Sequence, residues 1–177
     1  MFSKTLLNYR TSRRLKQNTL ERDSIGFSKS RLIGILFTME SEEKFSKIKM
    51  LQKDFEQLGK QVEVLSFLPK GATNYEFLFN IFTLQDISFT GKFRNEDVNK
   101  FAATRFDYLL VFDSSLSPIM RNIVARSNAH CRMGCYFEDS EKLFEFMISQ
   151  NEQRNSLHLI NEITKYLKGL NKESAYV

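Results

Sequence analysis

Basic side chains are concentrated at the start of this chain. Residues 1–31 contain eight Lys and Arg residues and two acidic ones, whereas residues 32–177 contain 18 basic and 19 acidic residues. The first segment therefore has a net charge of +6 and the rest −1. The eight cations are Lys4, Arg10, Arg13, Arg14, Lys16, Arg22, Lys29 and Arg31. Because like charges repel one another unless an acidic partner neutralises them, these residues predict a polyanion-binding site.

The chemistry of these cations favours phosphate as the group that they bind. Five of the eight are Arg, whose planar guanidinium forms paired hydrogen bonds with phosphate oxygens. We therefore expect docking on structured or ribosomal RNA, with an affinity that falls steeply as the salt concentration rises. Aromatic residues are scarce among the charges, so stacking on unpaired bases is not predicted.

Two alternatives use the same segment differently. In the first, apolar residues enter an acidic membrane surface while the cations meet the headgroups. Those apolar residues are Phe2, Leu6, Leu7, Leu15 and Leu20. In the second, the segment is a helical extension that is basic without having a partner.

A candidate pocket follows the most apolar central strand, because ligands of open α/β sheets bind beyond the carboxyl ends of the strands. Asp113 ends that strand, and Ser114, Ser115 and Ser117 supply hydroxyls and free N–H groups that suit an anion. Capping of the next helix by Ser115 or Ser117 explains the same serines. The pocket gives a second functional hypothesis: a reduced glycosyltransferase-like or nucleotide-binding enzyme, completed by formation of a homodimer.

The other loops predict no cofactor, no metal and no catalytic residue. The loop 38–43 has no glycine to cradle a phosphate, and its three Glu residues repel one. The spacing of Cys131 and Cys135, with His130 beside them, differs from that of structural zinc sites and predicts buried thiols. A small basic cluster at 92–100 is typical of a solvated surface. The sequence therefore favours a non-enzymatic interaction module.

Strand and helix patterns alternate along the body of the sequence. Strands are predicted at 31–39, 61–68, 108–113, 131–137 and 143–148, and an extended segment or loose hairpin at 77–89. Helices are predicted at 42–58, 96–105, 118–129 and 154–168. Ser41, Asn95 and Ser117 precede the first three helices as N-caps, and Gly169 is expected to end the last. This alternation predicts an α/β, Rossmann-like, doubly wound fold with a mostly parallel sheet.

The charge boundary suggests how the chain is divided. We expect a basic helical arm at 1–30, one Rossmann-like domain at 31–172 and a loose tail at 173–177. A cytoplasmic location is predicted, since no secretory signal precedes the two cysteines and no apolar run approaches the length of a membrane span. Residues 1–20 have no acidic residue, which leaves a cleaved organelle transit peptide as an alternative.

Two resemblances to known families follow from these motifs. The basic first helix, the strand Gly34-Ile35-Leu36, the D-x-S-x-x-G-K pattern from Asp86 to Lys92 and the strand 106–110 resemble a small uncharacterised bacterial family of unknown function. That resemblance implies no activity. Separately, residues 106–134 are similar to the end of the N-terminal half of heptosyltransferase-like glycosyltransferases, which implies a Rossmann-like fold. Those enzymes have a Gly-Asp pair where this chain has Met39-Glu40-Ser41.

Overall fold

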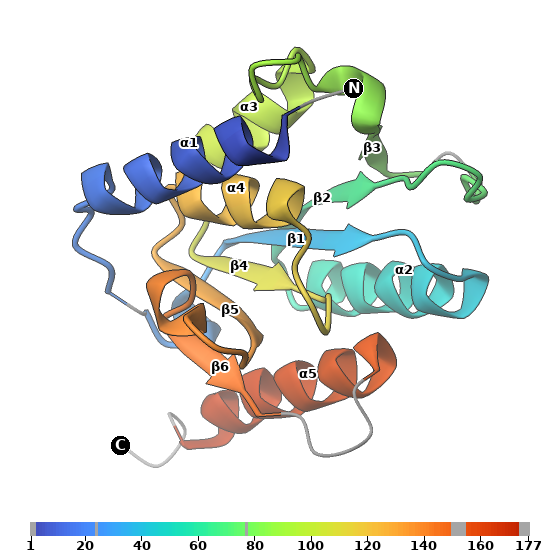
Figure 1. Cartoon of the computed structure of the whole chain (residues 1–177). Helices are drawn as coiled ribbons and strands as arrows, with labels where there is room; N and C mark the ends of the chain where they lie inside the picture. Colours follow the sequence, from blue (N-terminus) through green and yellow to red (C-terminus); the bar gives the residue numbers. More distant parts are fainter. Residues whose placement is uncertain (1–2, 24, 77, 150–154, 174–177) are drawn as a thin grey trace.

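The computed structural model of this protein describes residues 3–23, 25–76, 78–149 and 155–173. Within these residues six strands form one parallel sheet in the order β3-β2-β1-β4-β5-β6 (Figure 1). The strands are β1 (Leu32–Thr38), β2 (Gln61–Phe67), β3 (Asn80–Phe82), β4 (Tyr108–Val111), β5 (Cys131–Cys135) and β6 (Phe146–Ile148). The strand order changes direction between β1 and β4, which confirms the Rossmann-like doubly wound fold.

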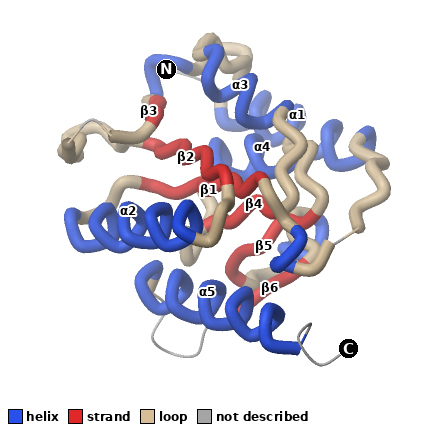
Figure 2. The backbone as a smooth tube through the Cα atoms, turned by 180° about the vertical axis from the view of Figure 1, so that it is seen from behind, coloured by secondary structure: helices blue, strands red, loops and turns tan. Residues whose placement is uncertain are grey.

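Helices cover both faces of the sheet. The described helices are α1 (Lys4–Gln17), α2 (Glu42–Gln57), α3 (Glu96–Ala103), α4 (Pro118–Arg126) and α5 (Ser156–Glu173). Helices α2 and α5 lie on one face of the sheet, and α3 and α4 lie on the other (Figure 1, Figure 2). Each face therefore has its own hydrophobic core, as a parallel sheet covered on both sides requires.

The central strand β1 is buried on both faces. Ile33, Ile35 and Phe37 pack in the core beneath α2 and α5, and Leu36 packs in the core beneath α3 and α4. Gly34 stands where the ring of Phe106 lies against the strand, and a Cβ built at Gly34 comes within 2.8 Å of that ring. This close approach explains a glycine in the interior of an otherwise aliphatic strand.

The predicted N-caps are confirmed. The Oγ of Ser41 accepts a hydrogen bond from the backbone N–H of Lys44 (3.2 Å), and the Oγ of Ser117 accepts one from Met120 (3.3 Å). The side chain of Asn95 accepts bonds from the first turn of α3. These short-range signals are local in sequence, and the structure therefore reproduces them closely.

Some element ends differ from the prediction. Helices α3 and α4 end at Ala103 and Arg126 rather than at 105 and 129. The prediction that Gly169 ends the last helix is wrong, because α5 continues to Glu173 and Gly169 does not have the positive φ of a C-terminal cap. In the predicted loose hairpin, β3 has three residues, and Ile87 pairs with Phe93 in one antiparallel bridge.

Helix α1 lies on the outer side of α4, which is enclosed between α1 and the sheet (Figure 1). Leu7 of α1 is fully buried, and the Thr11 hydroxyl donates to the Leu7 carbonyl oxygen (2.9 Å) and accepts from Asn122 Nδ2 of α4 (2.9 Å). The buried residues of α4 are Ile119, Met120, Asn122, Ile123, Val124 and Ala125. Because α4 has buried residues on nearly every side, its side away from the sheet must also be covered, and α1 covers it there.

The D-x-S-x-x-G-K segment holds the beginning of α1. The backbone N–H of Ser88 donates to the Lys92 carbonyl oxygen (2.8 Å), and the Lys92 N–H donates to Ser88 Oγ (2.9 Å), which closes a tight loop. Within this loop Gly91 contacts Leu7, and the carbonyl oxygen of Thr90 accepts from Arg10 Nε at 2.7 Å. The motif therefore has a structural role, which is to seat the basic helix.

The described residues between α1 and β1, 18–23 and 25–31, contact elements on both sides of the sheet. Asn18 Nδ2 donates to the carbonyl oxygens of Ala125 and Ser127, both at 3.2 Å. Further along, Phe27 is fully buried in the core beneath α2 and α5, and Lys60 Nζ donates to its carbonyl oxygen (2.7 Å). The division into an arm at 1–30 and a domain at 31–172 stays a prediction, but these contacts count against an arm that can be removed without loss of either core.

We expect Gly91→Ala to destabilise the protein more than Gly59→Ala. Both glycines have φ +75°, so alanine at either position carries similar backbone strain, about 1–2 kcal/mol. A Cβ at Gly91 meets Leu7 Cα at 3.3 Å, whereas nothing lies within 4 Å of a Cβ at Gly59. Urea unfolding of the two variants measures the difference. Equal losses of unfolding free energy would mean that α1 is not seated against Gly91.

Candidate nucleic-acid interface

An ion pair occupies the carboxyl ends of β1 and β4, where the strand order changes direction. Asp113 Oδ1 accepts from Lys44 Nζ (2.8 Å) and from the backbone N–H of Thr38 (2.8 Å), and its Oδ2 accepts from Thr38 Oγ1 (2.6 Å). The side chains of Lys44 and Asp113 are 1% and 2% exposed. Lys44 Nζ also donates to Glu40 Oε2 (3.0 Å), which accepts from Ser156 Oγ at the start of α5.

Two of the four candidate pocket residues already make structural contacts within the protein. Asp113 is committed to Lys44 and Thr38, and Ser117 caps α4. Ser114 is half-buried and Ser115 is exposed beside them. A ligand role for this loop stays a prediction, but both carboxylate oxygens of Asp113 already accept hydrogen bonds from Lys44 and Thr38.

The two thiols lie in strand β5. Cys131 and Cys135 are both buried, and neither forms a disulfide. Burial raises the pKa of the Cys131 thiol to about 12 and, together with the charge of the same thiol, raises the pKa of Tyr108 to about 12. Cys131 is thus protonated at neutral pH, as a buried thiol should be. Among the described residues, no cluster of three His, Cys, Asp or Glu side chains is arranged to hold a metal ion.

The structure distributes the eight predicted cations over three regions. Lys4, Arg10, Arg13, Arg14 and Lys16 belong to α1. Arg22 turns inward, donates to the carbonyl oxygens of Ser127 (2.9 Å) and Ala129, and lies 3.4 Å from Glu145 Oε1. Burial, followed by the charge of Arg132, lowers the pKa of Arg22. Lys29 and Arg31 are exposed near the amino end of β1. The α1 residues alone therefore form a compact group.

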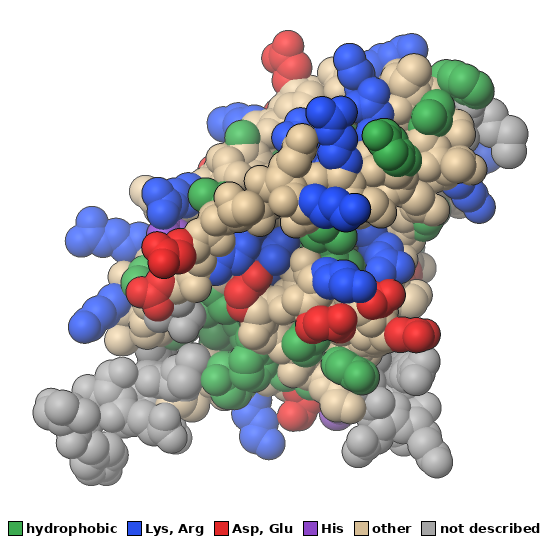
Figure 3. Space-filling model, turned by 60° about the vertical axis from the view of Figure 1, so that its left-hand side comes forward, with side chains coloured by type: hydrophobic (Ala, Val, Ile, Leu, Met, Phe, Trp, Pro, Cys, Tyr) green, Lys and Arg blue, Asp and Glu red, His purple; other side chains and the backbone are tan. Residues whose placement is uncertain are grey.

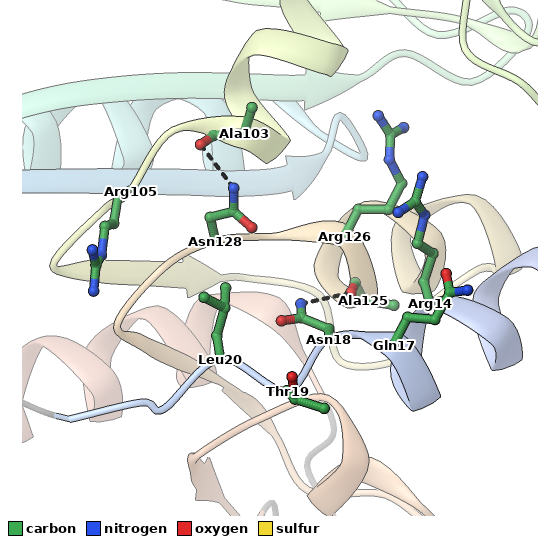
Figure 4. Close-up of a pocket in the computed structure, with 10 residues that line it drawn as sticks. All are labelled: Arg14, Gln17, Asn18, Thr19, Leu20, Ala103, Arg105, Ala125, Arg126 and Asn128. Atoms are coloured by element: carbon green, nitrogen blue, oxygen red, sulfur yellow. Dashed lines mark hydrogen bonds between the residues drawn. The ribbon is translucent and has the colours of Figure 1, made fainter.

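A groove runs between α1 and the C-terminal ends of α3 and α4. Its first pocket, about 550 Å³, is lined by Arg14 together with Arg105 and Arg126 (Figure 4). Its second pocket, about 230 Å³, is lined by Arg10, Arg14, Lys92 and Arg126. Arg14 and Arg126 line both pockets, so the two adjoin each other at this Arg pair. We call the set Arg10, Arg14, Lys92, Arg105 and Arg126 the basic groove.

The basic groove contains positive charge without neighbouring negative charge. None of its five residues takes part in an ion pair with a described residue, and no described Asp or Glu lines either pocket. Figure 3 shows Lys and Arg side chains gathered over the upper part of the face that it presents. Such a surface attracts phosphate and other anions.

Arg126 is the most constrained of these cations. Its NH2 group donates to Asn99 Oδ1 (2.7 Å), and its guanidinium lies 5.5 Å from the centre of the Phe93 ring. Asn99 Nδ2 in turn donates to the carbonyl oxygens of Phe93 and Asn95, which fixes the direction of its Oδ1. Burial, with a smaller contribution from the charge of Arg14, lowers the pKa of Arg126. The guanidinium is thus held in place beside a like charge.

Helix dipoles explain part of this arrangement. Arg14 and Arg126 stand in the last turns of α1 and α4, where the unpaired carbonyl oxygens stabilise a cation by about 0.3–1 kcal/mol. Arg105 and Lys92 lie in loops, and Arg10 lies in the middle of α1. The dipoles therefore account for two of the five cations and the bond from Arg10 to the Thr90 carbonyl oxygen for a third, which leaves Lys92 and Arg105 without either explanation.

Arg105 and Arg126 were not among the predicted site residues, and Lys92 was predicted to be a solvated residue. Arg105 precedes β4 and Arg126 precedes β5, so parallel pairing of those strands brings the two residues to the amino edge of the sheet. That signal was present in the predicted topology. The position of α1, which brings Arg10 and Arg14 to the same edge, depends on packing against α4 and had no local signal.

The fold and the groove define a Rossmann-like α/β protein whose basic helix α1 is packed against the domain. A comparison with protein families matches residues 4–170 to DUF6913, a family of unknown function, and the chain belongs to that family. The expected membership in an uncharacterised family is thereby confirmed. The similarity of residues 106–134 to heptosyltransferase-like glycosyltransferases is not shown and stays a prediction. No curated protein matches the chain. Among the described helices, none combines the length and apolar character needed to cross a bilayer.

We expect removal of either partner of the buried ion pair to destabilise the protein strongly. Lys44→Met leaves Asp113 buried without its cation, and Asp113→Asn leaves Lys44 without its full counter-charge, each at a cost of about 3 kcal/mol or more. The double variant removes both charges, so its loss of unfolding free energy should be well below the sum of the two single losses. Urea unfolding of the three variants measures this coupling. Additive losses would contradict it.

We expect the buried thiol to make stability depend on pH in the alkaline range. The pKa of Cys131 is raised from 9.0 to about 12 in the folded protein, so between these values the unfolded chain loses a proton that the folded chain keeps. Stability from this group is present below pH 9 and falls as the pH rises towards 12. The difference in unfolding free energy between wild type and Cys131→Ala should therefore shrink over that range. A constant difference would show that the thiol titrates equally in both states.

Proposed function

We propose that this protein is a non-enzymatic interaction module that docks on structured RNA through the basic groove, with ribosomal RNA as one such partner. The carrying observation is that five cations from four separate segments converge on two adjoining pockets without a described carboxylate between them. A cytoplasmic site of action is part of this proposal, because it supplies RNA and keeps the two thiols reduced.

The shape and chemistry of the groove support RNA as the polyanion. Four of the five cations are Arg, which bind phosphate oxygens through two parallel hydrogen bonds. The uncharged side chains beside them, Gln17 and Asn128, suit the sugar and base edges of a nucleic acid. A groove with these walls follows a phosphate backbone better than it matches a flat surface.

A membrane surface is the second candidate, and a specific observation favours it. Leu6 and Tyr9, 40% and 65% exposed, lie beside Arg13 on the outer side of α1. An interfacial helix presents apolar and cationic side chains together in this way. This surface shares Arg10 and Arg14 with the basic groove, but Leu6 and Tyr9 line neither groove pocket, so variants of Leu6 and Tyr9 distinguish the two candidates.

The proposal is tested with the double variant Arg14→Gln/Arg126→Gln. Its matched control, Lys47→Gln/Lys53→Gln, removes the same charge from α2 on the opposite face of the sheet. We expect the groove variant to bind a structured RNA at least tenfold more weakly than wild type, because two phosphate contacts are lost. The slope of log affinity against log salt concentration should fall by about 1.5. Fluorescence anisotropy at several salt concentrations measures both quantities.

The same proteins are then mixed with vesicles that contain phosphatidylserine. Equal RNA affinity of the groove variant and the control variant would overturn the proposal. Vesicle binding that survives in the groove variant and is lost in Leu6→Ser/Tyr9→Ser, with no RNA binding by wild type, would establish the membrane candidate instead. A thermal unfolding scan checks that each variant is folded, because Arg14, Leu6 and Tyr9 are exposed but Arg126 is half-buried and bonded to Asn99.

A further inference from the structure

The larger pocket of the basic groove has features that a general attraction for phosphate does not require. Arg14 and Arg126 lie side by side at one end of this pocket, and Arg105 lies at the other end (Figure 4). The second pocket begins on the far side of the same Arg pair. A phosphodiester held between Arg14 and Arg126 therefore has a pocket available for each of its two ester substituents.

The wall of the larger pocket offers hydrogen-bond acceptors. Asn18 Nδ2 donates to the carbonyl oxygens of Ala125 and Ser127, and Asn128 Nδ2 donates to that of Ala103 at 3.1 Å. Because carbonyl oxygens can only accept, these contacts fix which end of each amide faces the helix ends. Figure 4 shows both amide oxygens turned away from those carbonyls.

One of these acceptors has no partner in the protein. Asn18 Oδ1 is buried and makes no hydrogen bond with a described residue. Buried acceptors are nearly always satisfied, so this oxygen at the pocket wall has hydrogen-bonding capacity left for a donor from a water molecule or a ligand. The N–H groups on the edges of nucleic-acid bases are donors of this kind.

The remaining wall is apolar. Leu20 lines the pocket and is 44% exposed, and Ala103 lies across from it. Leu20 gives the pocket an apolar surface beside its three arginines, and the face of a base is a group that can pack on it. The volume of about 550 Å³ is in the range of pockets that hold small organic ligands.

We propose that this pocket seats one unpaired nucleotide of the bound RNA, with its phosphate on Arg14 and Arg126 and its base against Leu20, Asn18 and Asn128. This inference rests on the proposed function and adds the kind of RNA that is recognised. In a duplex the base is stacked and paired, so it cannot enter a pocket beside its own phosphate. The recognised element is then a loop, bulge or single-stranded end.

The test uses the full chain and three probes: a single-stranded 12-nucleotide RNA, the same strand in a duplex, which carries about twice the phosphate charge, and inorganic polyphosphate. We expect wild type to bind the single strand at least tenfold more tightly than the duplex or the polyphosphate. Asn128→Ala and Leu20→Ser should each weaken single-strand binding threefold or more and leave polyphosphate binding unchanged. Leu20→Ser keeps the test valid if Asn128→Ala fails to fold.

The outcomes distinguish a pocket that binds one unpaired nucleotide, called the seat below, from a basic groove that binds phosphate alone. Equal affinity for all three probes, with each probe weakened equally by Arg126→Gln, overturns the seat and leaves the groove as a phosphate-binding surface. Single-strand preference that Asn128→Ala and Leu20→Ser both leave intact also overturns the seat. If wild type binds none of the probes, the proposed function fails and the seat fails with it.

Discussion

The packing of α1 on α4 is the interaction on which the rest of this structure depends. Helix α4 is buried on the side facing the sheet and on the side facing α1, and Leu7 and Thr11 are the α1 residues that complete its cover. The energetic cost of exposing α4 is large, since each apolar side chain returned to water costs about 1.5–3 kcal/mol. The basic helix is therefore held against the domain by the same forces that hold the core together.

Fixed placement changes what the basic residues of α1 can do. On a mobile arm, cations adapt to any acidic surface, but the chain loses conformational freedom when it binds. On a docked helix, Arg10 and Arg14 stand at set positions beside Arg126 before any partner arrives. These charges repel one another, and in the proposed function a bound phosphate backbone neutralises them. Because these cations are held in position before binding, they form a site with a defined geometry.

The distribution of roles between the two edges of the sheet also follows from packing. In doubly wound folds the carboxyl edge is the usual ligand site. Here Lys44, Asp113 and Thr38 bind one another at that edge, and Glu40 links the group to Ser156 of α5. The basic groove lies at the amino edge, where the ends of α1, α3 and α4 meet.

The sequence was sufficient to predict the sheet and most of its helices. Buried runs such as 108–113 and the N-caps Ser41, Asn95 and Ser117 depend on residues that are close together in the sequence, so they can be predicted without knowledge of the tertiary structure. The end of α5 was mispredicted because glycine weakens a helix without stopping it. The cations of α1 were predicted from charge alone, but Arg105 and Arg126 join them through tertiary packing. Leu7 and Gly91, which fix that packing, are 84 positions apart and make no pattern in the sequence.

Hydrogen exchange of the α1 amides tests the central claim most directly. If α1 is an integral part of the domain, the amides of residues 8–17 exchange in the free protein about as slowly as those of α4, and more slowly still when structured RNA is bound. Exchange of these amides at the rate of an unfolded peptide, unchanged by RNA, would contradict the account.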